Sequence, residues 1–198
     1  FGTCFNTHHL FFAEDANDTL WFSTLSDVLG WFDTKAWDAT GDIAKSQGWM
    51  PFVLDLNGNG KLDEYVEPGD PVDPTKDQRI RGVGTGGMAN YGVMPSPVDD
   101  AIWISAAATP GMILRIDPGS NPPFTSLAEV YEPPLPGHTT RGIDVDRSGV
   151  VWAALNSGHL ASFDRRKCKV LNGPTATGKH CPEGWTLHQT PGPNFKGV

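Results

Sequence analysis

Short apolar segments alternate with polar turns along most of the chain, and three stretches repeat one order of these features. Each stretch begins with a short apolar strand, passes through a turn rich in Asp, Asn, Ser and Gly, and reaches a second apolar strand centred on a tryptophan. A third strand follows and ends in an aspartate 12 to 14 residues after the tryptophan. The tryptophans are Trp21, Trp103 and Trp152, and the aspartates are Asp33, Asp117 and Asp164. Intervals this similar indicate an internal repeat.

A fourth strand is predicted after each stretch, over residues 49–55, 127–134 and 184–192. Four short antiparallel strands that recur about every 40 to 50 residues are typical of the blades of a β-propeller. The sequence therefore predicts an all-β fold, with a partial β-propeller domain over residues 1–198. Blade 1 is expected at about 9–55, blade 2 at about 91–134 and blade 3 at about 138–192, with an insertion at about 55–90.

Three four-stranded blades do not close a ring, because propellers have about four to eight of them. We therefore expect an incomplete propeller, from a ring of about seven blades, that is either a fragment or a chain completed by another polypeptide. Each blade is expected to be apolar on both faces, so an open stack would expose two such faces. The three tryptophans are predicted to pack between blades rather than to bind a ligand.

Composition narrows the classes of fold and partner. The 23 glycines and 17 prolines disfavour long helices. A net charge of −8 and a pI near 5.1 disfavour nucleic acid or an anionic membrane as a partner. No apolar run approaches the roughly 20 residues that span a bilayer. Because the chain begins with Phe and shows no signal-like segment, we expect a mature or trimmed product.

The cysteines are consistent with a periplasmic or extracellular protein. Cys168 and Cys181 bracket a turn-rich loop and lack the paired CxxC spacing of a zinc site, so a disulfide is predicted. Closing a loop of about 15 residues would contribute about 3 kcal/mol in the chain-entropy model. Cys4 is either a buried free thiol or the partner of a cysteine outside this sequence.

The stretch from Val53 to Pro74 contains a loop with oxygen-bearing residues at alternate positions. In the EF-hand loop such positions wrap a calcium ion, with a glycine at position 6 for the sharp turn. The expected ligands are Asp55, Asn57, Asn59, the main-chain carbonyl of Lys61, and Asp63. The pattern also resembles the calcium loops of thrombospondin-type repeats, which need no flanking helices. We predict a structural Ca²⁺, whereas a simple Asn-Gly turn is the alternative.

The last calcium ligand is not fixed by this pattern. Position 12, which is a bidentate glutamate in an EF-hand, is Val66 here. Glu67 or Asp70 is expected to supply the remaining oxygens, unless water completes a weaker site.

The runs RGIDVDRSGVVW (141–152) and NDTLWFS (17–23) resemble blades of the streptogramin lyase, or virginiamycin B lyase, type of propeller and of its NHL-like and gluconolactonase-like relatives. The chain also resembles a group of large exported bacterial propellers of unassigned role. Lyase members imply a seven-bladed propeller that opens a cyclic ester with a divalent metal, using His and Glu on one axial face. Here Ser23 and Thr24 stand where the family often has glutamate after the Trp-Phe step, and none of the catalytic motifs is matched.

Polar residues gather where the innermost strand of each blade begins, at the axial face where propellers usually bind ligands. Aligning the three stretches places His9, Tyr91 and Arg141 at equivalent positions, preceded by His8, Asn90 and Thr140, with His138 just upstream; all seven are candidate ligand-binding residues. Histidines from two blades could hold a second divalent metal or act as acid and base, and an arginine could bind a carboxylate or phosphate. The alternatives are an exposed turn for the His pair and an inter-blade salt bridge for Arg141.

The remaining histidines, His159, His180 and His188, are predicted to lie on the surface, and the glycine-rich segment 82–87 is predicted to be a flexible loop. The sequence favours an exported scaffold that binds a small molecule or protein at its axial face and carries a structural calcium loop. The alternatives are a metal-dependent lyase or hydrolase, and a subunit completed by another chain. Whether the protein is an enzyme stays open at this point.

Overall fold

The computed structural model describes residues 6–24, 26–80 and 90–192, so Cys4 and segment 82–87 lie outside the described residues. Twelve of its strands form three antiparallel meanders of four, here called units 1, 2 and 3. Unit 1 contains β1 (Leu10–Phe12), β2 (Thr19–Ser23), β3 (Val28–Asp33) and β4 (Gln47–Leu54). Unit 2 contains β7 (Val93–Pro95), β8 (Ile102–Ala106), β9 (Met112–Asp117) and β10 (Leu127–Tyr131). Unit 3 contains β11 (Thr140–Val145), β12 (Val151–Leu155), β13 (His159–Phe163) and β14 (Trp185–Gln189).

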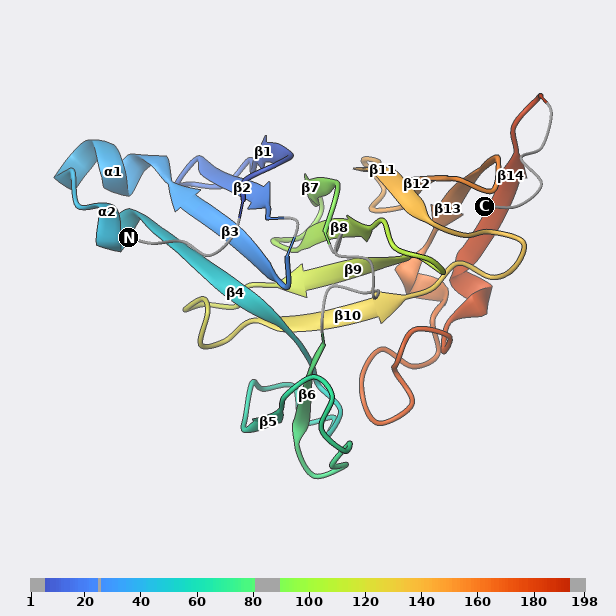
Figure 1. Ribbon diagram of the computed structural model, residues 1–198. Helices are drawn as coiled ribbons and strands as arrows, with labels where there is room; N and C mark the ends of the chain where they lie inside the picture. The colour runs from blue at the N-terminus through green and yellow to red at the C-terminus, as the bar shows by residue number, and fades with distance from the viewer. Residues whose placement is uncertain (1–5, 25, 81–89, 193–198) are drawn as a thin grey trace.

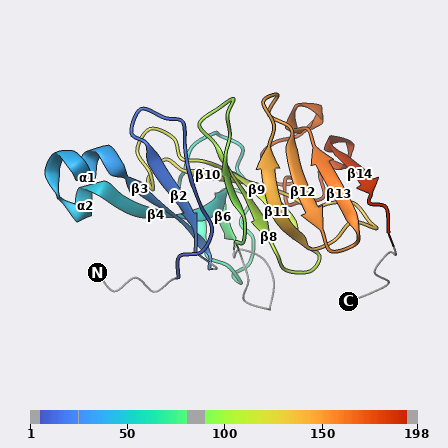
Figure 2. The same cartoon turned by 90° about the horizontal axis from the view of Figure 1, so that it is seen from above.

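The three units stand side by side in chain order, as Figure 2 shows. Within each unit the strands pair in sequence order, and each of the three repeated tryptophans lies on the second strand. β4 and β10 meet in parallel at Leu54 and Ala128, which joins the sheets of units 1 and 2, while unit 3 forms its own sheet. The result is a mostly-β, propeller-like arrangement (Figure 1).

Two hydrophobic cores fill the spaces between neighbouring units. Side chains of unit 1 such as Trp21 and Leu29 pack against one face of unit 2, around Leu114. The opposite face of unit 2 presents Trp103, which packs against Phe163 of unit 3. Since alternate residues of a strand point to opposite faces, the continuous apolar strands of unit 2 follow from burial on both sides.

The aspartate that ends the third strand of each unit caps the turn that follows it. Its carboxylate accepts a backbone N–H two or three residues further along, which orders that turn. The pairs are Asp33 with Ala36 at 2.7 Å, Asp117 with Gly119 at 3.0 Å, and Asp164 with Arg166 at 3.1 Å. After Asp33 the turn continues as two short helices that the repeat did not predict, α1 (Thr34–Thr40) and α2 (Ile43–Ser46).

The two outer faces of the stack differ, so the prediction that every unit is apolar on both faces is wrong for unit 3. Its outward positions include Ser162 and Thr186, which lie opposite each other, and His188, which lies opposite Leu160. Trp152 also lies on this face, where it stacks on His188 with a centroid distance of 5.4 Å. Trp152 is therefore half-buried, while Trp21 and Trp103 are core residues at 5% and 3% exposure.

The outward face of unit 1 is apolar and open. Cross-strand register places Leu10, Phe12 and Trp49 on the side that faces away from unit 2. They are 53%, 57% and 50% exposed. The ring of Phe22 lies over Gly30 on the same face, so close that a Cβ at position 30 would stand 2.0 Å from it. Among the residues that the structure describes, unit 1 therefore ends the stack with an exposed hydrophobic surface.

The segment 55–80, which follows unit 1, forms an excursion below the sheets (Figure 1). It contains β5 (Tyr65–Val66) and β6 (Asp77–Ile80), and β6 pairs antiparallel with the end of β4. Within the described ranges, no helix has the length and apolar character needed to cross a bilayer.

The predicted disulfide between Cys168 and Cys181 is confirmed, with the two Cα atoms 5.1 Å apart. It closes a loop that lies between the 3-10 helices η1 (Arg165–Lys167) and η2 (Pro182–Gly184). The loop reaches unit 2 and the excursion: Glu132 N donates to Gly178 O at 2.8 Å, and Gly173 N donates to Asp55 O at 2.7 Å. The disulfide thus fixes a connector between unit 3 and distant parts of the chain.

Candidate functional site

Equivalent serines define which residues correspond at the start of each innermost strand. The hydroxyl of Ser23 donates to Tyr91 O at 2.8 Å, and that of Ser105 donates to Arg141 O. His8 N donates to Ser23 O at 2.9 Å, as Tyr91 N does to Ser105 O at 2.7 Å. His8, Tyr91 and Arg141 therefore occupy equivalent positions. The sequence alignment paired His9 with Tyr91, so it was wrong by one residue in unit 1.

The side chains of these residues form a row across the three units, together with His9. We call His8, His9, Tyr91 and Arg141 the axial cluster. The rings of His8 and His9 are 5.2 and 4.7 Å from that of Tyr91, and 4.3 Å from each other. The guanidinium carbon of Arg141 lies 5.4 Å from the centre of the Tyr91 ring. Both histidines are exposed, and Tyr91 and Arg141 are half-buried.

Hydrogen bonding fixes the chemistry of His9. Its Nδ1 lies 2.9 Å from Tyr91 O. Because a carbonyl oxygen only accepts, His9 carries a proton on Nδ1, and in the neutral ring Nε2 keeps a lone pair. Such a nitrogen can accept a proton or coordinate a metal.

Asn90 and Thr140 take a different place from the axial cluster, because both are fully buried. Asn90 accepts from Thr24 N at 2.8 Å and donates to Val28 O at 2.6 Å. In unit 3, the Thr140 hydroxyl lies 2.8 and 2.7 Å from the carbonyls of Ala106 and Met112, the equivalent positions of unit 2. These two residues therefore fasten each unit to the one before it.

His138 lies apart from the row as well. Its Nδ1 is 3.2 Å from the hydroxyl of Thr139, and the side chain is half-buried. Of the other histidines, His188 is exposed as predicted, whereas His180 is half-buried against the ring of Tyr131 at 5.1 Å. Burial lowers the pKa of His180.

The predicted calcium loop is organised around the carboxylate of Asp55. It accepts the backbone N–H groups of Gly58 at 2.7 Å, Asn59 at 3.1 Å and Gly60 at 2.9 Å. Gly58 and Gly60 have φ of 76° and 74°, a conformation that glycine adopts without steric cost. Asn172 of the disulfide loop donates to the same carboxylate at 2.9 Å. Asp55 thus joins the excursion to unit 3.

The other predicted calcium ligands face in two directions. Asn59 donates to Asp63 Oδ2 at 2.5 Å, and Asn57 accepts Asn59 N at 3.1 Å, so these side chains lie together. Glu67 forms an ion pair with Arg79 at 2.8 Å. Lys61 contributes only its main chain to the loop, where its N–H bonds to Asn59 Oδ1 at 2.9 Å. In the described parts of the chain, no three His, Cys, Asp or Glu side chains form a ready-made metal group.

Asp77 joins this loop, although the sequence analysis did not identify it. It is completely buried at the start of β6, and its Oδ2 accepts Asp63 N at 2.9 Å. Its other oxygen, Oδ1, is buried without a hydrogen-bond partner. Burial raises the pKa of Asp77, and the carboxylates of Asp55 and Asp63 raise it further. An orphaned carboxylate oxygen fits a site for a hard cation.

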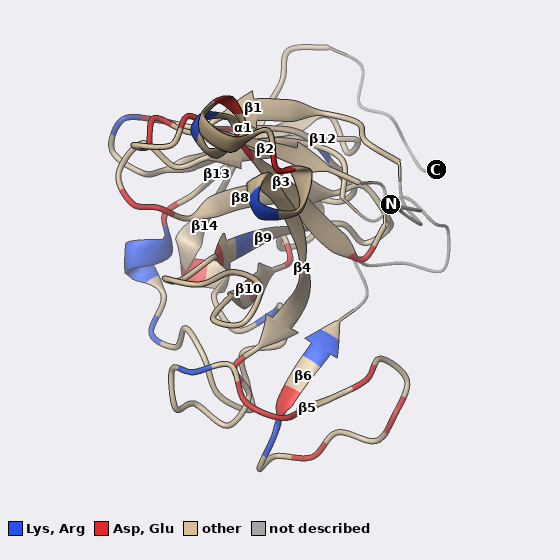
Figure 3. Ribbon diagram, turned by 90° about the vertical axis from the view of Figure 1, so that its left-hand side faces the viewer, with Lys and Arg blue, Asp and Glu red and all other residues tan. Residues whose placement is uncertain are grey.

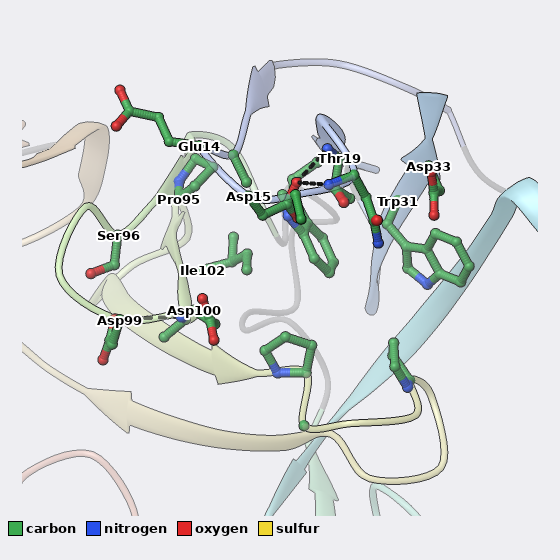
Figure 4. Close-up of a pocket in the computed structure, with 18 of the residues that line it drawn as sticks. Glu14, Asp15, Thr19, Trp31, Asp33, Pro95, Ser96, Asp99, Asp100 and Ile102 are labelled. Atoms are coloured by element: carbon green, nitrogen blue, oxygen red, sulfur yellow. Dashed lines mark hydrogen bonds between the residues drawn. The ribbon is translucent and has the colours of Figure 1, made fainter. Parts of the chain in front are cut away.

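A cavity of about 840 Å³ opens between units 1 and 2 at the turns that follow β1, β3, β7 and β9 (Figure 4). Several acidic side chains that line it already form hydrogen bonds or ion pairs within the protein. Asp15 accepts Thr19 N at 2.9 Å, Asp33 caps α1, and Asp99 pairs with Arg115 at 2.8 Å. Three of the five acidic side chains that line the cavity therefore have roles within the fold, and Glu14 and Asp100 are the other two.

A scan against models of known protein families finds no match. A search of curated proteins finds no significant match. Among solved structures, the chain is similar to virginiamycin B lyase from Staphylococcus aureus, with 13% identity and a TM-score of 0.43. It is also similar to a streptogramin B lyase structure, with 12% identity and a TM-score of 0.40.

The aligned regions cover 98% and 96% of this chain but only 59% and 57% of the two lyase chains. This chain therefore spans less than two thirds of their length. A similarity this weak concerns a propeller-like fold at most and carries no argument about activity.

Proposed function

We propose that the protein is an exported propeller-like scaffold that binds an anionic small molecule or protein segment at the axial cluster. The observation that supports this most is the convergence of one side chain from each unit, His8, Tyr91 and Arg141, at equivalent positions. The hydrogen bonds to Ser23 and Ser105 involve only the main-chain atoms of His8, Tyr91 and Arg141. The fold therefore does not require a ring or a guanidinium there.

The charge of Arg141 suggests the class of ligand. Among the described residues, no Asp or Glu forms an ion pair with its guanidinium, in contrast to Arg79, Arg115, Arg165 and Arg166. A guanidinium over an aromatic ring keeps its N–H groups for an incoming carboxylate or phosphate. The neighbouring histidines could add positive charge or hydrogen bonds.

Calorimetric titration with inorganic phosphate and with succinate tests this binding. We expect Arg141→Ala to weaken whichever anion binds by at least about tenfold, since a bidentate charged contact is lost. Arg147→Ala is the matched control, because Arg147 is an exposed arginine in the β11–β12 turn of the same unit. Absence of binding in the wild type, or equal effects of the two variants, would contradict the proposal.

We also propose that the loop from Asp55 to Asp63 binds a structural Ca²⁺. The alternating oxygen-bearing residues and the unpartnered Oδ1 of Asp77 support this. A bound ion would offset the entropy cost of ordering a long Pro-rich excursion. Thermal unfolding with CaCl₂ and with EDTA tests it: calcium should raise the Tm.

A catalytic function, as a metal-dependent lyase or hydrolase, is the alternative that His9 Nε2 would support. His8→Ala and His9→Ala should then abolish turnover of a cyclic ester together with transition-metal content, while leaving calcium binding intact. Retained turnover in both variants would exclude these histidines as the catalytic groups.

Completion by a further four-stranded unit is a second candidate, and the outward face of unit 1 supports it. Thr7 precedes His8 as Asn90 precedes Tyr91 and Thr140 precedes Arg141, yet Thr7 is exposed. Thr7 thus occupies the position that elsewhere fastens one unit to the preceding one. We infer that a unit of the same kind covers Leu10, Phe12 and Trp49. Light scattering gives the oligomeric state of the wild type, and thermal unfolding gives the stability of the wild type and of Phe12→Lys. A monodisperse wild-type monomer, together with a higher Tm for Phe12→Lys, would contradict the inference.

A further inference from the structure

We propose that Asp77 is the acidic ligand that closes the calcium loop, in place of the glutamate that an EF-hand carries at position 12. This inference rests on the calcium binding proposed above for residues 55–63. It replaces Glu67 and Asp70, which the sequence favoured, with a residue from a strand beyond the loop.

The first argument is the place of Glu67. Its carboxylate pairs with Arg79 at 2.8 Å, and Gln78 donates to Glu67 O at 3.4 Å, so both its side chain and main chain are held against β6. A ligand engaged with a guanidinium would have to break that pair before it could reach a cation. Glu64 is engaged in the same way, with Lys76 at 2.7 Å.

The second argument is the burial of Asp77. A carboxylate with no exposed surface is expected to be fully hydrogen-bonded or neutralised, because an unpaired buried charge costs several kcal/mol. The carboxylate of Asp77 accepts the Asp63 N–H at 2.9 Å and also interacts with the Asn57 N–H, while no donor meets Oδ1 in hydrogen-bond geometry. A cation adjacent to Oδ1 would satisfy this oxygen.

The third argument is the local charge. Asp55, Asp63 and Asp77 belong to one hydrogen-bonded group of loop and strand, and no Lys or Arg of the described ranges forms an ion pair with any of them. Acidic positions concentrate along this excursion in Figure 3. Three carboxylates and neighbouring Asn oxygens are the hard donors that Ca²⁺ prefers, at six to eight ligands.

A small surface cavity lies beside the exposed side of the group, and of the three carboxylates Asp63 lines it. It has a volume of about 370 Å³ and is lined by Asn57, Asn59, Asp63, Glu64, Thr75 and Lys76. Because the Asn59 side-chain amide now donates to Asp63 Oδ2 at 2.5 Å, binding would turn both side chains toward the ion rather than fill a rigid cage. Asp77 sits at the buried end of this group, on a strand paired with β4.

The test compares Asp77→Asn with Glu67→Gln in EDTA-treated full-length protein titrated with CaCl₂ by calorimetry. Both changes remove one negative charge and keep the shape of the side chain. We expect Asp77→Asn to weaken calcium binding by at least about tenfold, because affinity in such loops depends on the number of charged ligands. Glu67→Gln should bind within about twofold of the wild type.

Stability in EDTA separates a ligand from a structural residue. Removing an unpaired buried charge should leave the calcium-free Tm of Asp77→Asn unchanged or higher. In wild-type protein, the carboxyl ¹³C signal of Asp77 should shift when CaCl₂ is added, and that of Glu67 should not. This second measurement does not depend on whether the variant folds.

The outcomes distinguish this inference from the function on which it rests. A wild type that does not bind Ca²⁺ at millimolar concentration refutes the calcium loop and the role of Asp77 together. A wild type that binds, with Asp77→Asn unaffected and Glu67→Gln impaired, refutes the role of Asp77 and leaves the calcium loop in place. Weakened binding by Asp77→Asn alone, with a shifted Asp77 signal, supports the inference.

Discussion

The interface between units 2 and 3 depends on one largely buried carboxylate, and replacing Glu129 with alanine should strongly destabilise the protein. Glu129 accepts two hydrogen bonds from Arg165, each 2.6 Å long, and a third from the hydroxyl of Tyr131 at 2.5 Å. Arg115 lies 3.3 Å away. The side chains of Glu129, Arg115 and Arg165 are 15%, 10% and 30% exposed, so these ion pairs are only partly screened by solvent.

The magnitude follows from what the substitution leaves behind. Glu129→Ala removes both acceptors of the Arg165 guanidinium. It also leaves the hydroxyl of the fully buried Tyr131 without its acceptor. Breaking a buried ion pair costs about 3–5 kcal/mol, and an unsatisfied buried hydroxyl about 1–3 kcal/mol. Because both losses come from one carboxylate, they are not additive, and Arg115 keeps Asp99 at 2.8 Å. We expect a loss of about 3–5 kcal/mol, or roughly 10 °C in Tm for a chain of this size.

Urea unfolding followed by tryptophan fluorescence measures this loss. Glu64→Ala is the control, since Glu64 also pairs with a lysine but is 78% exposed, and such surface pairs contribute about 0–1 kcal/mol. A double-mutant cycle of Glu129→Ala with Arg165→Ala should give a coupling above about 1.5 kcal/mol. If both glutamate variants lost the same stability, below about 1 kcal/mol, the carboxylate would not hold the interface as we argue.

Three further predictions concern other parts of the fold. Burial lowers the pKa of His180 below its ordinary value of 6.5, so the unfolded chain binds a proton at a higher pH than the folded protein does. The free energy of unfolding should therefore fall as the pH drops below about 6.5. Thermal melts between pH 8 and pH 5 should show a smaller decrease for His180→Gln than for the wild type. Gly30→Ala should cost at least about 1 kcal/mol in urea unfolding, because the new Cβ would meet the Phe22 ring at 2.0 Å, whereas Gly142→Ala has open space and should be near neutral. Thr140→Val should cost about 1–3 kcal/mol in the same assay, since two main-chain carbonyls lose a buried hydroxyl, and an unchanged midpoint would exclude Thr140 as a fastening residue.

The sequence predicts those features that depend on interactions between residues close together along the chain. The Trp-to-Asp interval identified a recurring strand and the turn after it, because alternation along a strand and Asx capping involve residues two or three apart. The spacing of Cys168 and Cys181 predicted the disulfide that the structure contains. The one-residue error at His9 arose because a short exposed segment has no apolar period that would set its register.

The candidate site was only partly predictable. His8, His9, Tyr91 and Arg141 were named from their polar character at strand starts, and the structure brings their side chains together. Asn90 and Thr140 are also polar residues at strand starts, yet both are buried and hydrogen-bond to the preceding unit. Residue type alone does not distinguish a buried polar residue of this kind from an exposed ligand-binding residue. Asp77 carried no signal, because it follows Asp63 by 14 residues and lies outside any loop motif.

By itself, the sequence determined the strand-rich character of the protein, its turns, its disulfide and the loop built around Asp55, since each depends on neighbours along the chain. The tertiary structure decided which faces are covered, that Glu129 meets an arginine 36 residues away, and that Asn172 reaches Asp55 across 117 residues. The reason is that burial and charge pairing depend on distance in space. Segments remote in sequence become neighbours only when the three units pack against one another.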